Sequence, residues 1–122
     1  HLSLKINYPN KSDIIKGKAN LGGDIMIHGE CVTIGCIPLE NSPIEEMYVL
    51  CVEAKNRNRI IVADIYPCRF SYKNMALLAN ADAETLRFWA SLKAAYLSFE
   101  DNRRLPVIIT DKAGNYILGK AL

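Results

Sequence analysis

The sequence predicts an α+β fold in which a sheet carries helices on one side, and three observations predict it. Residues 2–8 alternate strictly between apolar and polar side chains, as in a strand with one face on a core. Residues 82–100 place large apolar side chains three or four positions apart, as an amphipathic helix does. The apolar stretches 107–110 and 116–118 flank a polar loop and indicate a β-hairpin.

Length and composition favour one globular domain spanning residues 1–122. Half of the residues are hydrophobic, 23% are charged, and the mean hydropathy is +0.03, which excludes a disordered chain. Lys and Arg number 15 against 13 Asp and Glu, a balance that disfavours binding of nucleic acid through its phosphates. No apolar run approaches the roughly 20 residues of a membrane span. We therefore expect no nucleic-acid partner and no transmembrane segment in this chain.

The first half of the chain predicts strands around a short helix. Ser12 or Asp13 is the expected cap of a helix that runs through Lys18. An apolar strand over residues 25–27 ends at His28, and residues 30–41 are expected to form a loop.

The clearest helix start in the sequence lies at residues 42–45. Ser42 is the expected cap, Pro43 suits the first helical position, and Glu45 completes a capping box. The apolar face of this predicted helix continues to about Lys55.

The second half predicts a central strand and two further helices. The β-branched run Arg59–Tyr66 is apolar on both faces and is closed by Pro67, a pattern typical of a central strand. A weaker helix is expected over Tyr72–Asn80. Asp82 is the expected cap of the longest helix, which ends near Glu100.

The chain opens inside a strand pattern, with neither an initiator Met nor a signal peptide. We therefore expect it to be a portion of a longer protein.

Two residue types limit the chemistry. His1 is the first residue, so an internal reaction that needs an imidazole must use His28. The four cysteines permit disulfides, a zinc site, or one reactive thiol among inert ones. A free thiol has a pKa of about 8.5, and a neighbouring imidazole can take its proton to leave the nucleophilic thiolate. His28 and Cys36 are separated by a loop with two glycines, which can fold back to bring them together.

The residues just before Cys36 also suit acyl transfer. Without a Cβ at Gly35, a substrate carbonyl can lie close to the backbone, where the N–H groups of Gly35 and Cys36 can face a developing oxyanion. Thr33 places a hydroxyl nearby. Spacing alone leaves open the alternative of a hydrogen-bonded histidine at a strand end and a small buried thiol.

Residues 28–36, His-Gly-Glu-Cys-Val-Thr-Ile-Gly-Cys, resemble the active-site segment of YkuD-type L,D-transpeptidase domains, in particular their YafK-like murein branch. The likeness covers nearly the whole chain. Matching segments lie within residues 4–10, 22–29, 44–48, 66–70 and 88–100.

The resemblance implies a cysteine-dependent acyl transferase that acts on peptidoglycan stem peptides. Cys36 would be the nucleophile that forms a thioester, and His28 the general base. Gly35 would lie in the oxyanion region, and Thr33 matches the family's Ser or Thr three residues before the cysteine. The implied fold is a YkuD-like, mostly antiparallel β core with helices on one side. Further strands of the full domain would precede Leu2.

The resemblance also implies the surroundings of the reaction. Gly29 and Arg69 are assigned to substrate binding, with no cofactor and no metal. The expected location is the periplasm or cell envelope, and a protein linked to peptidoglycan is a second possible partner. Ile34 and Pro38 depart from the commonest family pattern, which has His and Arg there. Transfer and hydrolysis therefore both stay open, and Arg69 becomes the candidate for the missing cation.

Two other classes of function stay open. A structural zinc site would use His28, Cys31 and Cys36, with Cys51 or Cys68 as the fourth ligand. The second is a non-catalytic module that keeps the fold and binds peptidoglycan but has lost turnover.

The remaining candidate residues favour structural roles. Cys31 is expected to pack near the site or to form a redox lock with Cys36, whereas Cys51 and Cys68 are expected to be core thiols. Trp89 and Tyr96 recur at helical spacing and favour core packing over a sugar-binding platform.

Overall fold

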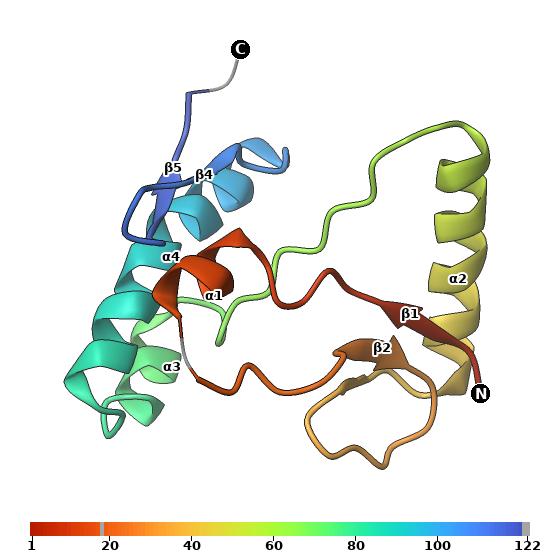
Figure 1. The fold of residues 1–122 in the computed structure, drawn as a ribbon, viewed down its shortest axis with the longest axis horizontal. Coiled ribbons are helices and arrows are strands. Elements are labelled where there is room, and N and C mark those ends of the chain that lie inside the picture. Colours follow the sequence, from red (N-terminus) through yellow and green to blue (C-terminus); the bar gives the residue numbers. More distant parts are fainter. Residues whose placement is uncertain (18, 121–122) are drawn as a thin grey trace. The chain divides into compact units, whose positions relative to one another are not determined.

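The computed structural model describes residues 1–17 and 19–120 (Figure 1). The described residues form four helices and five short strands, which confirms the α+β class. They divide into two compact units, His1–Asp13 with Gly17–Ala63, and Ile14–Lys16 with Asp64–Leu122. That residues 1–122 form one domain stays a prediction.

The first unit is built on a three-stranded sheet in the order β1, β2, β3. These strands span Ser3–Lys5, Met26–His28 and Ile37–Pro38. β1 and β2 are antiparallel, as the resemblance implied, whereas β2 and β3 are parallel. β3 lies inside the predicted loop 30–41, because a strand of two residues leaves no alternation for a sequence pattern to show.

Helix α2, Asn41–Asn56, packs against β1 and β2 and supplies a fully buried hydrophobic residue of this unit. Figure 1 shows α2 beside β1. Ile44 on α2 is 0% exposed. Along β1 exposure alternates as predicted, since Leu4 is half-buried while Ser3 and Lys5 are exposed. The face of the sheet that carries Leu4 therefore lies toward the core.

The predicted start of α2 is wrong in its detail. The helix begins at Asn41 rather than after Ser42, and the preceding Glu40 has φ +63° and makes no side-chain cap bond. The Asn41 carboxamide instead accepts a hydrogen bond from the Glu30 N–H at 2.9 Å. A tertiary contact thus sets this helix start, with Ser42 already inside the helix.

The predicted cap of helix α1, Lys11–Lys16, is also wrong. Asn10 is the cap, and its side-chain oxygen accepts from the N–H groups of Ser12 and Asp13. Asp13 accepts from the Asn10 N–H at 2.8 Å, which completes a capping box. Lys18, the predicted end, lies outside the described residues.

The predicted central strand Arg59–Tyr66 is wrong. In the described part of the chain this segment forms no strand, and Ile60 is 91% exposed. β-branched residues favour extended backbone, but a strand forms only where a neighbour completes its hydrogen bonds. The composition predicts an extended conformation, but no strand among the described residues pairs with this segment.

The second unit contains the two helices and the hairpin that the sequence predicts after residue 71. Its helices are α3, Tyr72–Leu77, and α4, Ala83–Asn102, and its hairpin joins β4, Ile108–Thr110, to β5, Tyr116–Leu118. α3 ends before the predicted Asn80. α4 packs against β5, and no helix in residues 1–17 and 19–120 is long and apolar enough to cross a membrane.

Contacts around α4 explain its sequence. Asp82 caps the helix, as predicted, by accepting from the Thr85 N–H at 2.9 Å. Tyr96 packs against the rings of Tyr66 and Phe70, with centroids 5.5 Å and 5.2 Å away, which confirms core packing for this residue. Trp89 is half-buried.

Candidate functional site

The pairing of β2 with β3 places Cys36 and His28 on one face of the sheet. In this parallel pair Ile27 lies opposite Ile37, and His28 lies opposite Pro38. Cys36 directly precedes β3, and the same register extended by one residue places it opposite Met26. Because side chains alternate along a strand, Cys36 shares the face of Pro38 and His28. The loop between them folds back, so that β3 pairs with β2.

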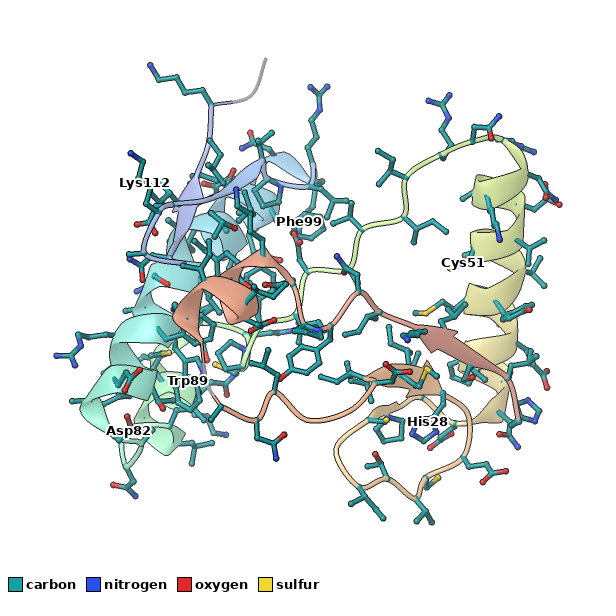
Figure 2. The ribbon with its side chains drawn as sticks, in the orientation of Figure 1. His28, Cys51, Asp82, Trp89, Phe99 and Lys112 are labelled. Carbon is teal, nitrogen blue, oxygen red and sulfur yellow. The ribbon has the colours of Figure 1, made fainter. Side chains whose placement is uncertain are left out.

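This face points away from the core side of the sheet. The register places Ser3 opposite His28, and Ser3 is exposed. His28 and Cys36 are each half-buried, so both side chains retain access to solvent. Figure 2 shows His28 in this first unit, near β2.

The hydrogen bond of the His28 ring defines which nitrogen can act as a base. Nδ1 lies within hydrogen-bonding distance of the Gly29 carbonyl oxygen. A carbonyl oxygen only accepts, so Nδ1 carries the proton and the neutral ring keeps its lone pair on Nε2. The thiol lies near a different group, since Sγ of Cys36 is 4.0 Å from the Asp24 carbonyl oxygen. Among the described residues, no hydrogen bond joins this ring and this thiol directly.

The turn before Cys36 has the geometry that favours glycine. Gly35 has φ +112°, and no other group lies within 4 Å of where its Cβ would stand. The Thr33 hydroxyl donates to the Cys36 carbonyl oxygen at 2.9 Å and so closes this turn. Thr33 therefore holds the backbone beside the thiol.

Gly29 is required by close packing. It is buried, and a Cβ there would lie 2.7 Å from Oδ1 of Asn41 and 2.8 Å from Cδ2 of His1. The Asn41 side chain also accepts from the Glu30 N–H, so it ties the segment after His28 to the start of α2. Asn41 is not among the residues predicted for the site, although an Asn before Ser-Pro is itself a signal of a helix start.

The other predicted site residues are described each within its own unit. Arg69 is exposed and belongs to the second unit, where its carbonyl oxygen accepts from Ser71 and Asn74. All four cysteines are free; Cys31 is exposed, and Cys51 and Cys68 are half-buried. In residues 1–17 and 19–120 no three His, Cys, Asp or Glu side chains are grouped as metal ligands.

The second unit holds an unusual carboxyl group that the sequence analysis did not single out. Burial raises the pKa of Asp64, and a hydrogen bond with Tyr66 offsets part of this effect. Burial also raises the pKa of Tyr66, with a further contribution from the negative charge of Asp64. Oδ2 of Asp64 is buried without a hydrogen-bond partner among the described residues.

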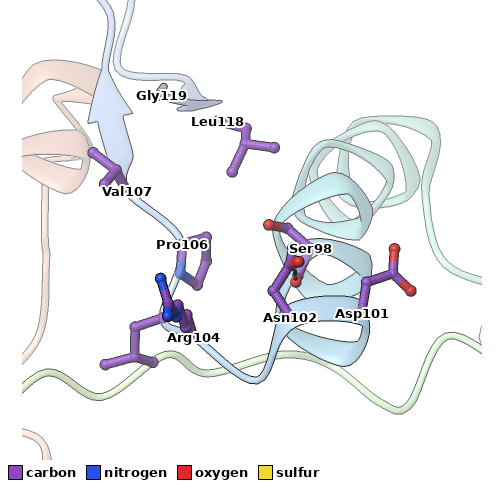
Figure 3. Close-up of a pocket in the computed structure, with 9 residues that line it drawn as sticks. Ser98, Asp101, Asn102, Arg104, Pro106, Val107, Leu118 and Gly119 are labelled. Atoms are coloured by element: carbon purple, nitrogen blue, oxygen red, sulfur yellow. Dashed lines mark hydrogen bonds between the residues drawn. The ribbon is translucent and has the colours of Figure 1, made fainter. Parts of the chain in front are cut away.

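A pocket of about 550 Å³ also lies in the second unit (Figure 3). Its lining includes neither Cys36 nor His28. The lining residues are Ser98, Asp101, Asn102, Arg104, Leu105, Pro106, Val107, Leu118 and Gly119.

Comparison with known proteins finds relatives along nearly the whole chain. The chain is 32% identical over 121 residues to "Putative L,D-transpeptidase YafK" of Escherichia coli strain K12, and equally so to the protein of that name in strain O157:H7. This alignment covers 98% of the chain and 47% of each relative, so the chain spans about half the length of the relatives it matches. No family model matches the chain.

Proposed function

Since the chain is related over nearly its whole length to YafK-like L,D-transpeptidases, we propose that it carries the active cysteine of an enzyme that acts on peptidoglycan. The substrate is a stem peptide, and the reaction is acyl transfer through a thioester on Cys36. The observation that carries the proposal is the β2–β3 register, which presents Cys36 and His28 on one face of the sheet.

The first step forms the thioester. Nε2 of His28 accepts the thiol proton of Cys36, and the thiolate attacks the carbonyl carbon of a peptide bond. The N–H groups of Gly35 and Cys36 stabilise the oxyanion, for which the open space at Gly35 leaves room. The intermediate collapses when the C–N bond breaks, and the leaving amine takes the proton from the His28 imidazolium. The Gly29 carbonyl oxygen holds the ring in the tautomer that this step needs.

The second step releases the acyl group. An amine of another stem peptide attacks the thioester, its proton passes to His28, and the thiol of Cys36 is restored. Water in place of the amine gives hydrolysis, which is the alternative outcome at the same site. Thr33 supports both steps by fixing the turn before Cys36. Peptidoglycan as the substrate implies a periplasmic or envelope location, and a peptidoglycan-linked protein is a second possible acyl partner.

Competitive alkylation tests the proposed nucleophile without a substrate. Cys36, Cys51 and Cys68 are all half-buried, so access alone predicts similar rates with iodoacetamide at pH 7. An activated Cys36 should react at least about tenfold faster than either, because only the thiolate is nucleophilic. His28→Ala should remove this advantage. Equal rates at the three cysteines, read by peptide mass mapping of the full-length protein, would contradict the proposal.

Turnover tests the reaction itself. Purified disaccharide-peptides are incubated with the full-length protein and analysed by mass spectrometry, where exchange of an amino acid or a new crosslink indicates transfer and shortened peptides indicate hydrolysis. Cys36→Ala should abolish both, while Cys51→Ala on α2 serves as the matched control and should retain activity. Binding of the peptides with no products from the wild type would instead support the non-catalytic module.

A further inference from the structure

A lysine occupies the same row of the sheet as the proposed nucleophile. Lys5 lies directly opposite Met26 in the β1–β2 pair. On the other side of β2, extending the β2–β3 register by one residue places Cys36 opposite Met26. Residues directly opposite each other point to the same face, so Lys5 shares the face of Cys36. Two strand spacings separate their backbones by about 10 Å, a gap that the long lysine side chain spans in large part.

Asp24 links the same two side chains independently of the register. Nζ of Lys5 lies 2.8 Å from Oδ2 of Asp24, and Sγ of Cys36 lies 4.0 Å from the carbonyl oxygen of Asp24. One residue therefore contacts both the ammonium group and the thiol. The ion pair holds the lysine head group at the residue whose backbone carbonyl lies near the thiol.

The ammonium group remains open to a ligand. The side chains of Lys5 and Asp24 are 57% and 55% exposed, so their ion pair is a weak surface pair that a second carboxylate can join or displace. Three N–H donors on Nζ allow it to bind a ligand oxygen while it keeps Asp24.

We infer that Lys5 binds a carboxylate of the acyl-donor peptide next to the bond that Cys36 attacks. The inference rests on the proposed function and deepens it by assigning the same site a substrate-positioning residue: Lys5 favours donor peptides whose carboxylate lies near the reacting carbonyl. Asp24 positions the lysine for this contact, and neutral peptides bind less well.

Two alkylating reagents test this charge preference at the thiol itself. Iodoacetate carries a carboxylate and iodoacetamide does not, while both react with the same sulfur. The ratio of their rates at Cys36, measured in the full-length protein by peptide mass mapping, should fall roughly three- to tenfold in Lys5→Gln at low salt. Lys5→Arg should keep the ratio, because it keeps the cation. Lys55→Gln on α2 is the matched control, and it should leave the ratio unchanged.

The outcomes separate this inference from the proposed function. An unchanged ratio of the iodoacetate and iodoacetamide rates in Lys5→Gln would overturn carboxylate binding. An equal fall in both rates would also overturn it, because it would mean that Lys5 acts on the thiol or on the fold. The proposed function is judged separately, by the iodoacetamide rate of Cys36 against Cys51 in the wild type. If Cys36 reacts fast with iodoacetamide but the ratio of the two reagents' rates is the same with and without Lys5, only the carboxylate-binding role of Lys5 is refuted. With a carboxylated stem peptide, Lys5→Gln should raise KM several-fold and leave kcat within about twofold.

Discussion

Replacing Gly29 with alanine tests how the segment after His28 is held. The new Cβ would lie 2.7 Å from Oδ1 of Asn41, which is about 0.5 Å inside an ordinary carbon–oxygen contact, and 2.8 Å from Cδ2 of His1. The Asn41 carboxamide must therefore move. When it moves, it loses the 2.9 Å hydrogen bond from the Glu30 N–H.

The expected cost of Gly29→Ala follows from these contacts. Loss of the hydrogen bond contributes about 1 kcal/mol, and overpacking of a filled site typically costs about 1–3 kcal/mol. Because part of the strain is relieved once the hydrogen bond is lost, we expect a total of about 2–3 kcal/mol. For a chain of this size each kcal/mol lowers Tm by roughly 3–6 °C.

Chemical denaturation of wild type and variants measures this cost. Gly23→Ala is the matched control, because no other group lies within 4 Å of a Cβ at that position. It should change the free energy of unfolding by less than about 1 kcal/mol. In an Asn41→Ala background the penalty of Gly29→Ala should shrink by at least about 0.5 kcal/mol, since the two residues are in contact. Equal stability of Gly29→Ala and Gly23→Ala, or full additivity with Asn41→Ala, would refute the reasoning.

Three further predictions concern backbone strain and pH. Gly35→Ala meets no steric clash but must adopt φ +112°, so denaturation should show a loss of about 1–2 kcal/mol, and an unchanged stability would contradict the need for glycine. Because burial raises the pKa of Asp64, ionisation of this carboxyl group lowers the stability of the fold above that pKa. The free energy of unfolding of Asp64→Asn should therefore exceed that of the wild type most at pH 7 and less toward pH 4, and a difference that does not change with pH would contradict this. Hydrogen bonds from Thr85 lower the pKa of Asp82, so the ionised carboxylate stabilises the fold above pH 4 and this stabilisation is lost as pH falls through the lowered pKa. In thermal melts below pH 4, the Tm of the wild type should therefore fall more steeply with pH than the Tm of Asp82→Asn, and parallel curves would argue against this.

Local patterns in the sequence determined the elements whose hydrogen bonds and caps form between residues close together in the chain. The cap at Asp82 and the long apolar repeat after it predict α4, because each of its hydrogen bonds closes within four positions. The hairpin at residues 108–118 and the strand that ends at His28 follow from equally local patterns. The candidate pair of Cys36 and His28 also came from the sequence, because few residue types can form an acyl intermediate and only one internal imidazole exists.

The tertiary structure decided what depends on a distant partner. The run 59–66 has strand composition but forms no strand, since the described residues supply no neighbour to pair with it. The start of α2 is set by Asn41 reaching Glu30, eleven residues earlier, and no capping rule contains that contact. The sequence names Cys36 and His28, but their shared face and the presence of Lys5 on it come from strand register. A shift of one residue would turn every side chain of β3 to the other face, and only the pairing of β3 with β2 in the tertiary structure shows which face it takes.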